Sequence, residues 1–296
     1  MRGMLGVVGG FLALLCAAPA AAAVIEMEPT SDWGIDYSAD SCALSRNFGA
    51  GNRTVGLEIR QFSPTRQAYR FSVRSTGMTV PSTRQRRGWA AARFYPGTGY
   101  WPLGSLLELR LPDDAEGATF PIDFFNDARA VSEARGIPLD RAELARSIGN
   151  ITGVELQNVF NRDVLLNTGS FVEPMRAMQN CMEELQQHWG IDVEAHRNLT
   201  REATPRDMQI WAERITEHYP SRAMVQGRQA VLHVRLDISA EGLPTGCHIQ
   251  EGMGEDVFQQ TACELLLANA VFDPALDSDG NAIASYFIVN IDYRTT

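Results

Sequence analysis

The chain has 296 residues, which is enough for two domains, and its hydrophobic fraction of 45% is typical of an ordinary globular protein. Its formal net charge of -10 argues against a nucleic-acid partner, because phosphate binding depends on surplus positive charge. The sequence shows no internal repeat and no low-complexity tract.

The first residues are typical of a secretory signal. Arg2 is followed by an apolar stretch at residues 4–15 and by alanines at positions 20–23 that suit a signal peptidase. We therefore predict a signal peptide at residues 1–23 and an exported, periplasmic bacterial protein. The alternative is an uncleaved anchor in the inner membrane, since the apolar run 4–25 approaches the roughly 20 residues that span a bilayer. No second run of that length follows, so cleavage would leave no membrane span.

Residues 41–121 show the period of two that predicts half-buried strands. Apolar side chains alternate with polar ones, often arginine, at residues 42–48, 54–60, 69–74 and 105–111. Between positions 53 and 93 the charged residues are arginines, with Glu58 as the single acid. This basic stretch could attract the acidic C-terminal part of the chain, or an anionic lipid or glycan surface. A solvated sheet face is the simpler interpretation.

An aromatic cluster lies in a segment rich in Pro and Gly: Trp89, Phe94, Tyr95, Tyr100 and Trp101. These side chains could line a ligand groove. Packing over the end of the sheet is the role that we expect for them.

The next part of the chain favours helices. Residues 127–135 and 139–148 suit short helices separated by Gly136-Ile137-Pro138, and residues 154–160 and 163–167 suit a hairpin. The clearest helix is 174–189, which Gly190 would end. Its apolar side chains follow helical spacing, so we expect them in the core and not in a copper site: Met175, Met178, Cys181, Met182 and Leu185.

The polar segment 198–205 predicts a linker between two domains. We therefore divide the chain into a β-rich N-terminal domain with helices at residues 24–203 and a C-terminal domain at residues 204–296. The fold class expected is α+β.

Residues 204–296 predict a small module. A short helix after Tyr219-Pro220 ends at Gly227, and strands follow at 230–238 and near 247–249. An amphipathic helix at 255–269 and a last strand at 284–293 complete an α-β-β-α-β order. This order predicts a three-stranded antiparallel sheet with its helix on one face.

These features resemble the C-terminal domain of TonB-type energy transducers. The features shared, in this order, are Tyr219-Pro220, a strand led by Gly227, the turn at Gly242, Cys247 and the run Phe272-Asp273-Pro274-Ala275. The resemblance covers under a third of the chain. Transducers of that kind also have an inner-membrane anchor and a long spacer rich in Pro, Glu and Lys, and this chain shows no such spacer.

In the resembled family, the sheet edge and the Tyr-Pro region receive a short segment of an outer-membrane receptor. The resemblance therefore implies that Tyr219, Pro220, Tyr286, Ile288 and Asn290 contact an extended segment of a membrane or envelope protein. An unpaired strand edge also offers its backbone groups to such a segment, or to a second copy of the chain in a dimer.

Four cysteines follow the predicted signal: Cys42, Cys181, Cys247 and Cys263. An even number in an exported protein favours disulfides, and three pairings are formally open. A local bridge from Cys247 on a strand to Cys263 on the covering helix would leave Cys42 and Cys181 to join the two ends of the N-terminal domain. Four buried free thiols are the alternative.

No motif indicates catalysis. A Walker loop, a nucleophile elbow, a dinucleotide fingerprint and an HExxH zinc motif are all missing, so we predict neither an enzyme nor a cofactor. His233 and His248 fall on neighbouring strands and could face each other, but no third metal ligand accompanies them, and no metal site is predicted. Residues 277–280 lack the distal Glu of a calcium loop and are interpreted as a turn.

Three functions remain. The leading hypothesis is a periplasmic envelope protein whose C-terminal module binds an extended partner segment, linked to outer-membrane transport. The second is an anchored TonB-type energy transducer for transmembrane transport. The third is an enzyme of unknown type that docks through the module, which a buried cluster of ionisable residues near positions 89–101 would favour.

Overall fold

The computed structural model describes residues 23–64, 68–82, 84–86, 88–111, 115–136 and 140–294. A β-rich N-terminal region (residues 24–203) is followed by a smaller C-terminal module (residues 204–296) of helices and strands, which confirms the α+β class. The predicted signal peptide lies outside the described residues except for Ala23.

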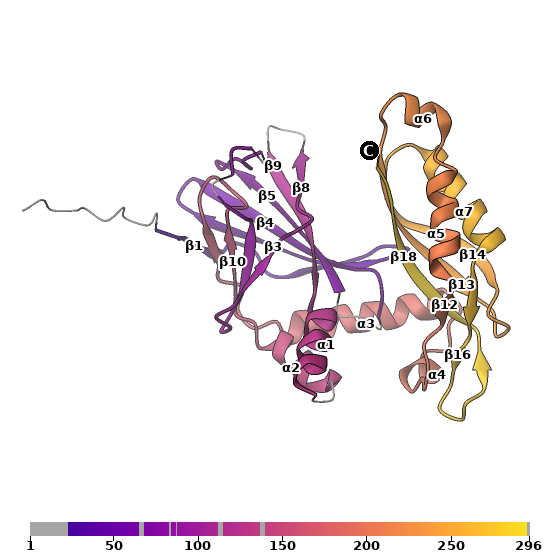
Figure 1. Cartoon of the computed structure of the whole chain (residues 1–296). Coiled ribbons are helices and arrows are strands. Elements are labelled where there is room, and N and C mark those ends of the chain that lie inside the picture. Colours follow the sequence, from indigo (N-terminus) through magenta and orange to yellow (C-terminus); the bar gives the residue numbers. More distant parts are fainter. Residues whose placement is uncertain are drawn as a thin grey trace, which may run out of the picture.

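The N-terminal region is built on one long, curled sheet (Figure 1). Within the described residues its strand order is β7-β6-β10-β11-β1-β3-β4-β5-β9-β8, and β2 pairs with β3 beside this path. Phe71 of β5 and Phe94 of β6 are far apart in that order, yet their ring centroids lie 5.7 Å apart. The sheet therefore curls until its two ends share one core. The strands are β1 (Ile25–Pro29), β2 (Gly34–Tyr37), β3 (Cys42–Ala50), β4 (Arg53–Gln61), β5 (Ala68–Thr76), β6 (Ala91–Tyr95), β7 (Tyr100–Pro102), β8 (Leu107–Arg110), β9 (Glu116–Asp123), β10 (Gly153–Gln157) and β11 (Val164–Leu166).

The predicted strands and hairpin appear with small shifts of their ends. In β4, Val55, Leu57 and Ile59 are buried while the side chains between them are not, as a period of two requires. The strands expected at 42–48, 69–74 and 105–111 are β3, β5 and β8, and β10 and β11 form the expected antiparallel hairpin. The sequence pattern gave no signal for β1, β2, β6, β7 or β9.

Three helices close the core of the N-terminal region: α1 (Phe124–Arg135), α2 (Arg141–Gly149) and α3 (Val172–His188). Met178, Cys181 and Met182 of α3 are buried in this core, which confirms their structural role. Gly190 follows with a positive φ of 75°, a conformation that favours glycine and ends the helix. Figure 1 shows α3 running toward the C-terminal module.

The C-terminal module contains a sheet of order β14-β13-β18, with helices on the face away from the N-terminal region (Figure 1). Leu232 and Leu236 of β13 pack there with Phe258 of α7 and Trp211 of α5. The expected α-β-β-α-β order is present, but a further helix, α5, precedes it, and the sequence analysis missed that helix. The elements are α4 (Val193–Arg197), β12 (Thr204–Arg206), α5 (Met208–Glu217), α6 (Ser221–Val225), β13 (Ala230–Ile238), β14 (Pro244–Met253), α7 (Asp256–Asn269), β15 (Val271–Asp273), β16 (Ala275–Leu276), β17 (Ala282–Ile283) and β18 (Ser285–Tyr293).

The turn between β13 and β14 depends on Gly242. Its φ is +82°, and a Cβ atom at this position would lie 2.1 Å from the backbone oxygen of Phe272. The amide of Phe272 in turn donates to the backbone oxygen of Gly242 at 2.9 Å. Only glycine permits this close approach of the turn to β15. The predicted turn at residues 277–280 is confirmed between β16 and β17.

Both disulfides form. Cys42–Cys181 joins β3 to α3, and Cys247–Cys263 joins β14 to α7, so the open choice among three pairings resolves to one local bridge and one long-range bridge.

The segment predicted as a linker, residues 198–205, lies against the C-terminal module. Thr200 donates its backbone N–H to Leu276 at 2.9 Å, β12 pairs with β15, and Ala203 is buried in the core of the module. The division at residue 204 stays a prediction.

The two disulfides should contribute unequally to stability. Cys42 and Cys181 are separated by 139 positions, and Cys247 and Cys263 by 16. Because the entropy removed from the unfolded chain grows with loop length, replacing both members of the long-range pair with Ala should lower the free energy of unfolding by about 5 kcal/mol, against about 3 kcal/mol for the local pair. Urea unfolding of the two double variants measures this. A larger loss from the local pair would contradict the chain-entropy explanation.

Candidate functional site

The last strand, β18, is an edge strand of the C-terminal sheet, and it carries part of the predicted partner-binding site. Residues 285–293 pair antiparallel with residues 230–238 of β13, and β18 is the last strand in the sheet order. Val289, Ile291 and Tyr293 point into the core of the module and are buried. Within the described part of the chain, no strand pairs with the other side of β18. Its outer backbone groups therefore form an open edge.

The beginning of this edge is covered by the segment after α3. The ring of His196 accepts a hydrogen bond from the Ser285 hydroxyl at its Nε2 atom over 3.0 Å, because its Nδ1 atom donates to the backbone oxygen of Asp192. Tyr286 is 8% exposed and its ring lies 5.6 Å from that of Trp189. A narrow cavity between Leu199 and β18 ends at Ile288. The first half of the edge is thus in contact with the protein's own chain.

The C-terminal end of β18 is open on its outer side and is supported by packing inside the module. Asn290 and Asp292 are exposed, whereas the Tyr293 ring packs against Tyr219 at a centroid distance of 5.4 Å. The Tyr219 hydroxyl donates to the backbone oxygen of Arg228. Tyr219 therefore holds the end of the strand in place, and Pro220 follows it as the first residue before α6.

The residues predicted to contact a partner are thereby divided between two environments. Tyr286 lies at the covered beginning of β18, Ile288 at the limit of the cover, and Asn290 on the exposed part. Tyr219 and Pro220 lie beside Tyr293 at the opposite end. The structure brings Tyr219, Pro220 and the open part of β18 together, and their role in partner binding stays a prediction.

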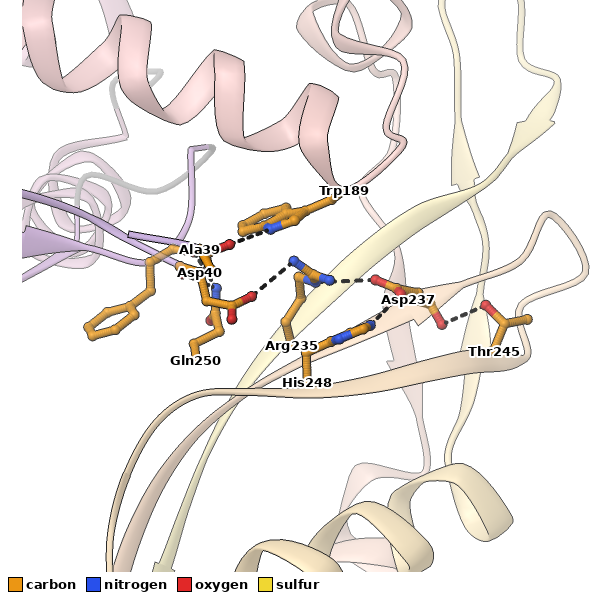
Figure 2. Close-up of polar contacts among 9 residues, drawn as sticks. Ala39, Asp40, Trp189, Arg235, Asp237, Thr245, His248 and Gln250 are labelled. Atoms are coloured by element: carbon orange, nitrogen blue, oxygen red, sulfur yellow. Dashed lines mark hydrogen bonds and ion pairs between the residues drawn. The ribbon is translucent and has the colours of Figure 1, made fainter. Parts of the chain in front are cut away.

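The face of the sheet opposite the helices meets the N-terminal region through Arg235 (Figure 2). The Arg235 side chain is 4% exposed and donates to Asp237 on its own strand at 3.2 Å and to Asp40 of the N-terminal region at 3.4 Å. Its guanidinium carbon lies 4.1 Å from the ring centroid of Trp189 at the end of α3. Burial lowers the pKa of Arg235, while the charges of Asp237 and Asp40 oppose that effect.

Gln250 of β14 extends this contact. Its amide nitrogen donates to the backbone oxygens of Asp40 at 2.8 Å and of Phe62 at 3.1 Å. Trp189 donates its indole N–H to Ala39 at 3.4 Å (Figure 2). The turn between β2 and β3 is therefore fixed to both α3 and the C-terminal sheet.

A second charged contact lies on the same face. Arg70 of β5 donates to Glu251 and to the Nε2 atom of His233, and the His233 ring stacks on Phe62 at 4.6 Å. Attraction between the basic stretch and the acidic module was the alternative to a solvated sheet face, and Arg70 and Glu251 form such a contact. Asp40, Phe62, Arg70 and Trp189 were not predicted as interface residues. One signal was present in residues 230–238. Charged residues at alternate positions there face away from the helices, and they could have indicated a covered polar face.

The family comparison decides the class of the module. Residues 216–295 match the family model described as the Gram-negative bacterial TonB protein C-terminal. They form a TonB C-terminal domain. Among solved structures, the chain is similar to the NMR solution structure of the TonB C-terminal domain of Helicobacter pylori, with 16% identity over 36% of this chain and 86% of that chain and a TM-score of 0.24. A search of curated proteins found no match.

The two histidines on the TonB C-terminal sheet have separate partners. His233 contacts Arg70, whereas His248 bonds to Asp237 at 2.7 Å, and the register pairs His233 with Glu251 instead of His248. In the described residues, no group of three or more His, Cys, Asp or Glu side chains is arranged to hold a metal ion. None of the described helices has both the length and the apolar character to span a bilayer.

An ionisable cluster with one buried member, Glu155, lies near the aromatic segment. Glu155 of β10 is 2% exposed and accepts hydrogen bonds from the hydroxyls of Tyr95 and Tyr100, each at 2.8 Å, and from Arg93. Burial alone would raise the pKa of Glu155, but the hydrogen bonds from Tyr100, Tyr95 and Arg93 hold it below its ordinary value. The carboxylate is ionised and bonded to its neighbours, which supports a structural role in joining β6, β7 and β10. Phe94 and Trp101 pack with Phe124, as expected for aromatics at a sheet end.

His233 should make the contact between the two regions sensitive to acid. Burial and the nearby charge of Arg70 lower its pKa to about 3, from an ordinary value of 6.5. The unfolded chain therefore binds more protons than the folded chain between these values, and stability falls as the pH drops through that window. From pH 7 to pH 4, the free energy of unfolding should fall by about 3 kcal/mol more in the wild type than in the His233→Gln variant.

Urea unfolding at the two pH values measures this difference. His218→Gln is the matched control, because His218 is exposed. An equal loss in the wild type and in His233→Gln would contradict the assignment.

Proposed function

We propose that this chain is an envelope protein whose TonB C-terminal domain binds an extended segment of a membrane or envelope protein at the open part of β18. The observation that carries the proposal is the unpaired edge from Val289 to Tyr293, next to Tyr219 and Pro220. The family match supports a TonB-like role coupled to transport, and it supports a protein partner over a small-molecule substrate.

Backbone pairing at this edge would give weak, reversible binding. Each added hydrogen bond contributes about 1 kcal/mol net, and only alternate residues of a strand direct their backbone groups outward. The covered beginning of β18 limits the partner to the far end. Exposed Asn290 and Asp292 would then contact side chains of the guest on the face toward the N-terminal region.

The cluster around Glu155 does not favour an enzyme, since its groups are engaged with one another and its carboxylate stays ionised. The choice between a free periplasmic protein and an anchored transducer depends on residues 1–22, which lie outside the described part.

Peptide titration tests the binding site. We expect extended peptides from the periplasmic segments of outer-membrane receptors to shift the backbone amide resonances of residues 289–293 in the isotope-labelled chain, and to leave those of residues 285–287 nearly unchanged. The control peptides carry Pro at alternate positions and cannot pair as a strand.

Absence of shifts along residues 289–293, or equal shifts with the Pro-containing peptides, would contradict the proposal. Chemical shifts that depend on protein concentration without peptide would assign the edge to a second copy of the chain instead.

Intact-mass measurement of the exported protein tests its location. The small residues at positions 20–23 favour cleavage, so the mature chain should start near Val24. A mass that includes residues 1–23 would instead support an inner-membrane anchor and energy transduction.

A further inference from the structure

A cavity of about 790 Å³ lies against α3. Its other walls come from the end of β4, the start of β5, α2 and the segment 193–202 that follows α3. Pockets that take small molecules have volumes of about 300–1,000 Å³, so this cavity is large enough for one. None of the described residues that line it belongs to β18, so it is distinct from the proposed partner edge.

Two polar side chains in the cavity wall are buried without a protein partner. Tyr69 is 8% exposed and Gln186 is 4% exposed. Among the described residues, neither the Tyr69 hydroxyl nor the Gln186 side-chain amide has a hydrogen-bond partner, and neither group is fully enclosed by protein. Both residues line the cavity, so their polar atoms reach its interior. Because buried polar groups are usually hydrogen-bonded, the contents of the cavity supply the partners that these two groups lack.

Both groups are carried by firmly held elements. Tyr69 lies near the start of β5, where the sheet register aligns it with Gln61 of β4. Gln186 lies in the last turns of α3, and the disulfide between Cys181 and Cys42 ties this helix to β3. The hydroxyl and the amide therefore occupy fixed positions, which lowers the entropy cost of binding a ligand between them.

The two groups select an uncharged partner that both donates and accepts. Burial raises the pKa of the Tyr69 hydroxyl well above its ordinary value of 10.0, so it remains a neutral donor. The Gln186 side chain offers N–H donors and a carbonyl acceptor. An amide group matches this pair, because its oxygen can accept from Tyr69 while its N–H donates to the Gln186 carbonyl.

The charged side chains of the wall do not favour an ion. Those that the described residues contribute are two acids and two arginines: Glu183, Glu202, Arg197 and Arg201. Arg197 donates to Glu183 at 2.8 Å, and Arg201 donates to the backbone oxygen of Pro274 at 3.0 Å. Burial lowers the pKa of His196, which keeps that ring neutral at neutral pH. The described wall therefore carries no surplus charge of either sign.

The rest of the wall is largely apolar. Met175, Met178 and Met182 follow one another at helical spacing along the cavity side of α3. Ile148 of α2 and Leu199 add branched side chains. Methionine side chains are flexible and polarisable, so they can adapt to an apolar group of varied shape.

We propose that this cavity binds an uncharged small molecule that carries an amide group on an apolar body. The amide bonds to Tyr69 and Gln186, and the apolar body packs on the methionines of α3. The segment 193–202 closes over the ligand from the side of the C-terminal module.

Octanamide is the probe, and octanoate is its charged counterpart with the same carbon chain. We expect octanamide to shift the methyl resonances of Met175, Met178 and Met182 in the chain from Ala23 onward. Met208, which is 43% exposed on α5, should not shift. Octanoate should bind about tenfold more weakly, because its carboxylate would be buried without a free cation.

Tyr69→Phe and Gln186→Leu should each weaken octanamide binding about fivefold, the equivalent of about 1 kcal/mol for one hydrogen bond. The matched controls are Tyr37→Phe, since Tyr37 is 54% exposed, and Gln187→Leu, since Gln187 is the exposed neighbour of Gln186. Both controls should bind octanamide as the wild type does. Because the Tyr69 hydroxyl has no partner among the described residues, its removal should not lower the midpoint of urea unfolding.

Three results would overturn the proposal. The first is no shift of the three methionine methyls with octanamide, or an equal shift at Met208. The second is octanoate binding as tightly as octanamide. The third is a Tyr69→Phe variant that binds octanamide unchanged and unfolds at lower urea, which would give the hydroxyl a structural role instead. Shifts along β18 with receptor peptides are measured separately, so failure here leaves the proposed partner edge standing.

Discussion

The burial of Arg235 is the constraint on which the arrangement of the whole chain depends. A guanidinium that is 4% exposed needs carboxylate partners, because an unpaired buried charge costs several kcal/mol. One partner, Asp237, comes from the same strand, while Asp40 and the ring of Trp189 come from two separate parts of the N-terminal region. The observed placement of the two regions brings Asp40 and Trp189 to Arg235. The contact therefore specifies how the C-terminal sheet sits as well as contributing to its attachment.

This placement determines which part of the TonB C-terminal domain is open to a partner. Helices cover one face of its sheet. The other face is covered by Phe62, by Arg70 and by the turn that contains Asp40. His196 and Trp189 then cover the beginning of β18. The N-terminal region thus covers part of the proposed docking edge. A guest segment is restricted to the end of the strand beside Tyr219.

Local patterns predicted those parts of the structure that arise from local physics. The period of two in residues 230–238 placed β13 at its observed bounds, and helical spacing of Met178, Cys181 and Met182 placed α3 in the core. The pairing of Cys247 with Cys263 was one of three that the sequence left open, favoured because a strand and its covering helix lie close in sequence. Tyr219 was predicted only as a residue that contacts a partner, and its buried ring packs against Tyr293 inside the module.

The interface escaped prediction because it joins residues that are far apart in the chain. Arg70 and Glu251 are separated by 181 positions, and each alone is typical of a solvated charge on a strand. Asp40 lies in a short turn, and turns of that composition carry no information about what they contact. The helix α5 was missed because Trp211 and Ile215 give only a short apolar stripe after the polar segment 198–205.

The most direct test of the central claim is whether the two regions form one rigid body in solution. Residual dipolar couplings of backbone amides, measured for the weakly aligned chain at neutral pH, report the orientation of each region. We expect a single alignment tensor to fit the couplings of residues 24–197 and residues 204–294. Two tensors of different magnitude or orientation would show that the regions move independently, and that Arg235 does not hold the sheet against its neighbour.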